Sequence, residues 1–89
     1  MITKKSTGTD WLAASPEARS RYVTKACQDC FKHGLGVVDS SLVAEGITEF
    51  FSIPRLHKKS VHFIFGEVFS ATRHLGHYRR LLDSYRVGP

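Results

Sequence analysis

The sequence feature that most constrains the fold is an apolar repeat of about 3.6 residues, enclosed by helix start and stop signals. Ser15-Pro16-Glu17 places an N-cap residue, a proline at the first helical position and an acidic residue in the first turn. The predicted helix runs to about His33, and Gly34 supplies the left-handed residue that ends it. Its apolar side consists of Tyr22, Val23, Ala26, Cys27 and Cys30.

A second helix is predicted between residues 39–41, which offer three candidate N-caps, and about Ser52. Pro54 restricts the backbone of the residue before it, so the helix ends there. Gly46 falls on the apolar face, where glycine costs a helix about 1 kcal/mol relative to alanine. We therefore expect another helix to cross closely at Gly46.

The third and longest apolar repeat covers about residues 57–75. Its segment 61–65 is β-branched and aromatic, as in a strand, but the apolar spacing continues beyond it at 3.6 residues, which favours a helix. After Gly76 the apolar positions are rotated by nearly a quarter turn. This change of phase predicts a kink or a separate short helix over about 77–85.

These elements predict an all-α fold of three to four helices around a single small core. Residues 1–8 are polar and are interpreted as a flexible N-terminal tail, and residues 9–89 as a single helical domain. Thr9 and Asp10 could open a short helical turn. The core candidates are Trp11, Leu12, Tyr22, Val23, Ala26, Leu42, Val43, Ile47, Phe50, Val61, Ile64, Phe65, Val68, Leu75 and Leu82.

The order of a helix, a connection at 52–55 and a basic helix is the layout of a helix-turn-helix unit. No glycine lies in this connection, and its spacing to Val61 is longer than the compact motif allows. A helix-turn-helix-like arrangement therefore stays an alternative within the all-α class.

Length and composition narrow the function classes. The chain has 89 residues, which leaves little room for an enclosed active-site cavity, so we expect no enzyme activity. No apolar run approaches the ~20 residues of a transmembrane helix, and the start lacks the apolar region of a signal peptide. With two cysteines, a secreted disulfide scaffold is not indicated, and we expect a cytoplasmic protein.

The charge of the chain is uneven. Residues 1–51 hold six basic and six acidic side chains, whereas residues 52–89 hold seven basic and two acidic ones, a net charge of +5. Four of the five histidines also lie in the second half. This asymmetry predicts an anionic partner for the C-terminal half.

The angular positions of the cationic residues around the third predicted helix indicate a common surface. If the third helix stays nearly straight past Gly76, its cationic positions fall within about 80° of one another and form a ridge opposite the apolar stripe. Gly66 and Ser70 keep the middle of this ridge small. The candidate binding residues are Arg55, Lys58, Lys59, His62, Arg73, His77, Arg79 and Arg80.

The sequence contains no strong catalytic or metal-binding motif. Cys27 and Cys30 form a C-x-x-C that His33 extends, but their position within a helix favours two core residues over a zinc site or a thioredoxin-like redox site. The C-terminal histidines match no nuclease or metalloprotease pattern. We therefore assign no catalytic residue, no metal ligand and no cofactor.

Two functions follow as hypotheses. The first is a small basic nucleic-acid-binding or regulatory protein that contacts phosphates through its cationic C-terminal helix. The alternative is a protein-binding adaptor or inhibitor, of the type found in phages and mobile elements, that docks on an acidic or nucleic-acid-binding surface. An exposed Phe63, Phe69 or Tyr78 beside the ridge favours the alternative. No membrane partner is expected, and a homodimer is an open alternative.

Overall fold

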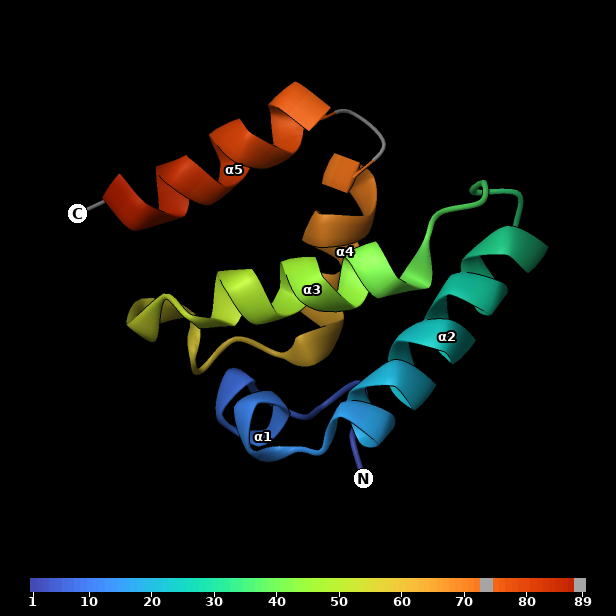
Figure 1. The fold of residues 1–89 in the computed structure, drawn as a ribbon, viewed down its shortest axis with the longest axis horizontal. Coiled ribbons are helices and arrows are strands. Elements are labelled where there is room, and N and C mark those ends of the chain that lie inside the picture. Colours follow the sequence, from blue (N-terminus) through green and yellow to red (C-terminus); the bar gives the residue numbers. More distant parts are fainter. Residues whose placement is uncertain (73–74, 88–89) are drawn as a thin grey trace.

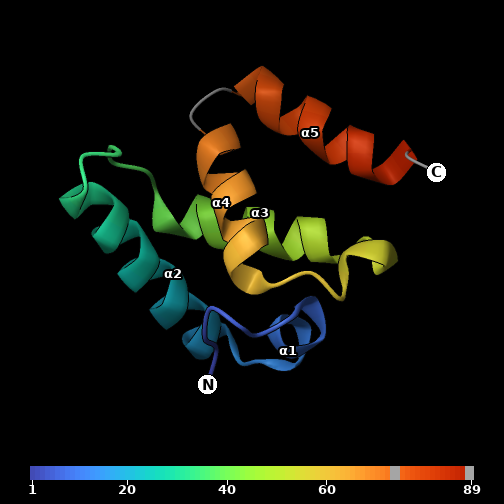
Figure 2. The same cartoon turned by 180° about the vertical axis from the view of Figure 1, so that it is seen from behind.

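The computed structural model describes residues 1–72 and 75–87, and within them it contains five α-helices, one 3-10 helix and no strand. The predicted all-α fold is confirmed. In Figures 1 and 2, α4 crosses α3 at the centre, and α2 and α5 lie on different sides of this pair. The elements are α1 (Gly8–Ala13), α2 (Pro16–Lys32), α3 (Ser40–Phe51), η1 (Pro54–Leu56), α4 (Val61–Thr72) and α5 (Leu75–Val87).

The start and stop signals of α2 act as the sequence predicts. The Ser15 hydroxyl accepts a hydrogen bond from the Ala18 amide at 3.2 Å. At the other end Gly34 adopts a φ of 77°, and the Leu35 amide donates back to the Cys30 carbonyl at 3.0 Å. This 6→1 hydrogen bond is typical of a glycine-terminated helix and sets the direction in which the chain leaves α2.

The expected close crossing at Gly46 is confirmed. A Cβ atom added to Gly46 would lie 2.7 Å from Cγ1 of Val68 on α4 and 3.3 Å from the ring of Tyr78 on α5. Two helices therefore meet the backbone of α3 at one residue, and only a residue without a side chain fits there.

Helix α1 has only six residues, and side-chain hydrogen bonds with α2 and α3 hold it in place. Trp11 is fully buried, and its indole Nε1 donates to the Thr48 hydroxyl of α3 at 2.9 Å. Arg19 of α2 donates to the carbonyls of Trp11 and Leu12, both at 2.9 Å, and satisfies the end of α1. Arg19, which belongs to the half of the sequence whose charges sum to zero, thus has a structural role.

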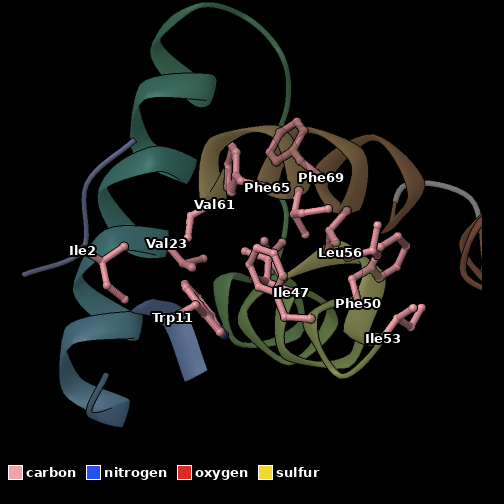
Figure 3. Close-up of a cluster of buried hydrophobic side chains, with 14 of the residues drawn as sticks. Ile2, Trp11, Val23, Ile47, Phe50, Ile53, Leu56, Val61, Phe65 and Phe69 are labelled. Atoms are coloured by element: carbon pink, nitrogen blue, oxygen red, sulfur yellow. The ribbon is translucent and has the colours of Figure 1, made fainter. Parts of the chain in front are cut away.

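The core lies between α1, α2, α3 and α4, with α5 covering one edge (Figure 3). Two core predictions are wrong: Leu12 and Leu42 are 39% and 56% exposed, because Trp11 and Val43 beside them take the buried positions. Tyr22 and Ala26 are half-buried, and the Leu75 side chain lies outside the described residues. Buried apolar residues that sequence reasoning missed are Ile2, Phe51, Ile53, Leu56, Phe69 and Ala71.

The predicted third helix is divided. Helix α4 ends at Thr72 and a separate helix, α5, begins at Leu75, so the change of phase in the apolar stripe does mark two helices. The division lies between Thr72 and Leu75, just before Gly76. The start also differs from prediction: residues 57–60 form a turn, and residues 52–60 with η1 replace the short turn of a compact helix-turn-helix unit.

Two glycine-to-alanine changes in neighbouring helices test the crossing. We expect Gly46→Ala to destabilise the protein by about 1–2 kcal/mol, because the clash with Val68 outweighs the gain in helix propensity. Gly66→Ala is the matched control: a Cβ at Gly66 meets no atom within 4 Å, so the same change should stabilise by about 0.5–1 kcal/mol. Urea unfolding followed by Trp11 fluorescence measures both, and a Gly46→Ala variant as stable as the parent contradicts the crossing.

Candidate functional site

The first residues of the chain form an ordered turn. The Ser6 amide donates to the Thr3 carbonyl at 3.1 Å, and the Thr3 amide donates to the Ser6 hydroxyl at 3.0 Å. Lys4 and Lys5 occupy the two central positions of this turn, and both are exposed. The turn therefore presents two adjacent cations at its tip.

Backbone hydrogen bonds attach this turn to the start of α4. The Val61 amide donates to the Ser6 carbonyl at 2.6 Å, and Thr7 forms an antiparallel bridge with Ser60. Ile2 is 8% exposed and belongs to the core. Residues 1–8, interpreted from sequence as a flexible tail, are thus packed against the rest of the domain.

The bridge joins two segments that each carry a lysine pair, more than fifty positions apart in the sequence. Because the pairing is antiparallel, the two lysine pairs lie on opposite sides of the bridge. Lys58 and Lys59 directly precede Ser60, and Lys4 and Lys5 lie within three residues of Thr7. We call these four side chains the lysine cluster. All four are exposed, and within the described residues none of them forms an ion pair. The Asp10 carboxylate near the bridge accepts hydrogen bonds from Thr7.

Lys58 and Lys59 lie directly before the amino end of α4. The Ser60 hydroxyl accepts from the Phe63 amide at 3.0 Å, and the first turn of α4 contains no acidic residue. The amino end of a helix carries a partial positive charge, so two lysines directly before it are electrostatically unfavourable. The sequence thus concentrates positive charge where folding alone disfavours it.

An aromatic side chain borders the lysine cluster. Phe63 is 42% exposed, and the Nζ atom of Lys59 lies 5.5 Å from the centre of its ring. His62, next to it, is exposed. Of the other two aromatic residues considered from sequence, Phe69 is buried and Tyr78 is half-buried.

The remaining predicted cations lie on a different surface. His77, Arg79 and Arg80 are exposed on α5, whose axis points away from that of α4 in Figures 1 and 2. A continuous ridge is expected only if one helix stays nearly straight past Gly76, and this condition is not met, because α4 and α5 are separate helices. Arg73, another candidate binding residue, lies outside the described residues.

Helix α5 is anchored to α3 by a polar contact. The Tyr78 hydroxyl donates to the Glu49 carboxylate at 2.5 Å, and Arg86 lies 3.6 Å from the same carboxylate. Arg55, another predicted binding residue, donates to the Ser84 carbonyl at 3.3 Å and links η1 to α5. Arg55 and Arg86 therefore take part in contacts within the domain.

The C-x-x-C pair lies within α2, as predicted, and both cysteines are half-buried against the core. Burial raises the pKa of both thiols, and the nearby Asp29 adds to the increase at Cys30. In the described part of the chain, no three histidine, cysteine or acidic side chains come together as metal ligands. Across the same residues, no helix is both long and apolar enough to span a bilayer.

Lys4 and Lys5 were missed from the sequence because they lie in the half whose charges sum to zero. A local signal for an ordered start does exist: Thr7 and Asp10 have the spacing of a capping box, directly before the buried Trp11. The pairing with Ser60, by contrast, has no local signal.

The chain was compared with protein-family models, curated proteins and solved structures, and none of them matches it. The functional inferences below therefore rest on its own residues.

The anchor of α5 gives a pH-dependent prediction. Burial and the hydrogen bond to Glu49 raise the pKa of Tyr78 above its ordinary value near 10. The unfolded chain therefore loses this proton at lower pH than the folded chain, so the stabilisation is complete below pH 10 and declines as the pH rises above it. We expect Tyr78→Phe to be less stable than the parent by about 1 kcal/mol at pH 7.

This difference should stay constant from pH 7 to 9 and shrink above pH 10, because phenylalanine has no proton to lose. Urea unfolding of both proteins across this range measures it. A difference that does not change with pH contradicts the role of the Tyr78–Glu49 contact.

Proposed function

We propose that this protein binds nucleic acid by placing the lysine cluster against the phosphate backbone. The observation that carries the proposal is the backbone pairing of Thr7 with Ser60, which joins two distant segments that each carry a pair of exposed lysines. Neutralising phosphates with lysine releases counterions, and this release supplies most of the affinity of a sequence-independent contact.

The electrostatics of the cluster support an anionic ligand. Its lysines form no ion pair with described residues, so a phosphate does not have to displace an internal partner. A phosphate at the start of α4 also interacts favourably with the positive end of the helix. Binding there would offset the unfavourable position of Lys58 and Lys59 before α4.

The cations of α5 form a separate surface and are given no part in the primary contact. Among them, Arg79 supplies an internal comparison, because it is exposed and carries the same charge as each lysine of the cluster. The proposal thus differs from simple attraction between a basic protein and DNA, since it assigns the binding to one region.

One observation favours the alternative, a protein-binding adaptor or inhibitor. Phe63 exposes its ring beside Lys59, and an aromatic residue next to a cation is common at the centre of protein interfaces. A stoichiometric partner that resists nuclease, is lost with Phe63→Ala and is retained with Lys58→Gln would support this alternative over nucleic-acid binding.

Salt dependence tests the proposed function. Four phosphate contacts predict that affinity for a labelled duplex DNA falls about 100-fold between 50 and 200 mM salt. Lys5→Gln and Lys58→Gln should each lower the magnitude of the slope of log K against log salt by about 1. Fluorescence anisotropy measures affinity and slope together.

The matched control is Lys32→Gln, which removes one positive charge at the far end of α2 and should leave the slope unchanged. Arg79→Gln should have a similarly small effect. If Lys32→Gln weakens binding as much as Lys58→Gln, the contact is diffuse and the proposed site is wrong. Absence of binding at 50 mM salt overturns nucleic-acid binding altogether.

A further inference from the structure

A groove of about 850 Å³ runs along α2 on the side that faces the N-terminal segment. One wall is α2 from Ala18 to His33, and the other is formed by residues 1–4 and the start of α4. Figure 3 shows Ile2 beside α2, on the segment that makes the second wall. We call this feature the α2 groove. Its volume lies within the range of small-molecule sites.

The floor of the α2 groove is predominantly apolar. Ile2, Ala26 and Phe65 line it, and Leu35, which is 48% exposed, stands at the end where the chain leaves α2. Cys30 contributes a thiol that burial keeps protonated, since burial raises its pKa. A ligand that fills this floor therefore needs an apolar body.

A single polar group on the floor lacks a partner. The Tyr22 hydroxyl is buried, and within the described residues it has no hydrogen-bond partner. Burial raises the pKa of Tyr22, so the phenol keeps its proton and can donate a hydrogen bond. A buried donor without an acceptor is costly, but this oxygen is not accessible from the groove and so adds no polar contact to the groove surface.

Positive charge gathers at one end of the groove. Lys4, Arg21, Lys25 and His62 line the part next to the N-terminal segment, and Arg21 and Lys25 lie one turn apart on α2. Asp29 lines the groove farther along α2, toward Leu35. His33 and Leu35 line the far end. Lys4, Arg21 and Lys25 are thus placed for an anionic group in the part of the groove before Asp29.

From this arrangement we propose that the α2 groove binds a long-chain anionic amphiphile, with its headgroup among Lys4, Arg21 and Lys25 and its alkyl chain directed toward Leu35. The length of α2 from Arg21 to His33 is about 18 Å, enough for an extended chain of a dozen or more carbons. A helical peptide is about 10 Å wide, whereas an extended alkyl chain is a single file of methylene groups. This proposal does not rest on nucleic-acid binding, although Lys4 lines the groove and also belongs to the lysine cluster.

Titration of the full chain with sodium laurate, followed by two-dimensional NMR, tests the proposal. We expect saturable one-to-one binding, with the largest shifts at Ile2, Ala26 and Leu35. Dodecyltrimethylammonium has a comparable tail and the opposite charge, and it should bind at least 10-fold more weakly. Equal binding of the two amphiphiles, or shifts confined to other parts of the chain, would overturn the proposal.

Two variants localise the ligand. Ala26→Phe fills the floor and should lower laurate affinity at least 10-fold, whereas Thr24→Phe, on the outer face of α2, should leave it unchanged. Arg21→Gln should lower affinity about 3- to 5-fold, and Lys32→Gln, its matched control, should not. If Ala26→Phe does not fold, the comparison of Arg21→Gln with Lys32→Gln decides alone.

Other occupants would give distinct results. A dimer seen by sedimentation, abolished by Ala26→Phe and not displaced by laurate, would assign the groove to a second copy of the chain. Binding of a synthetic leucine- and glutamate-based amphipathic peptide at the same resonances, without laurate binding, would assign it to a protein partner. Either result overturns the proposal.

Discussion

The contact of Gly46 with Val68 and Tyr78 is the constraint on which the remaining helices depend. It allows the Val68 side chain of α4 to lie close against the backbone of α3, and the large side chains around this contact fill the core. Phe50, one turn beyond Gly46 on α3, packs against the rings of Tyr78 and Tyr85. The glycine at position 46 therefore determines both how α4 crosses α3 and where α5 packs.

The second constraint is the backbone pairing between Thr7 and Ser60. In a domain without strands among its described residues, this isolated bridge joins a segment at the start of the chain to the amino end of the central helix. The hydrogen bonds that satisfy backbone groups at the start of α4 also attach the turn that carries Lys4 and Lys5 to the segment that carries Lys58 and Lys59. The charge concentration is thus a consequence of how one helix end is completed.

Sequence patterns predicted the elements governed by local physics and missed those governed by pairing at a distance. The cap at Ser15 and the glycine end at Gly34 act through residues within one turn of themselves, so α2 was predicted almost to the residue. The phase change near Gly76 is also local, and it correctly indicated two helices. Leu12 was misassigned because a six-residue helix can bury one side chain and expose its neighbour, which periodicity cannot distinguish.

The candidate site shows the same division. Lys58, Lys59 and His62 were found because they are close in sequence, whereas Lys4 and Lys5 join them only through a bridge to Ser60, far along the chain. Counting charge by halves of the sequence separated two lysine pairs whose segments are joined by backbone hydrogen bonds. It also grouped Arg79 and Arg80 with the lysines, although they lie on a different helix.

The N-terminal segment has a part in both proposed sites, and this has a physical consequence. Lys4 belongs to the lysine cluster and also lines the α2 groove, while Ile2 in the same segment completes the apolar wall. An anionic headgroup in the groove would reduce the positive potential that the cluster offers to phosphates, because the two anions would share Lys4. By linkage the effect is reciprocal, so each ligand would weaken the other by the same factor. Competition between an amphiphile and a polyanion thus follows from placing a single lysine on the turn between the two surfaces.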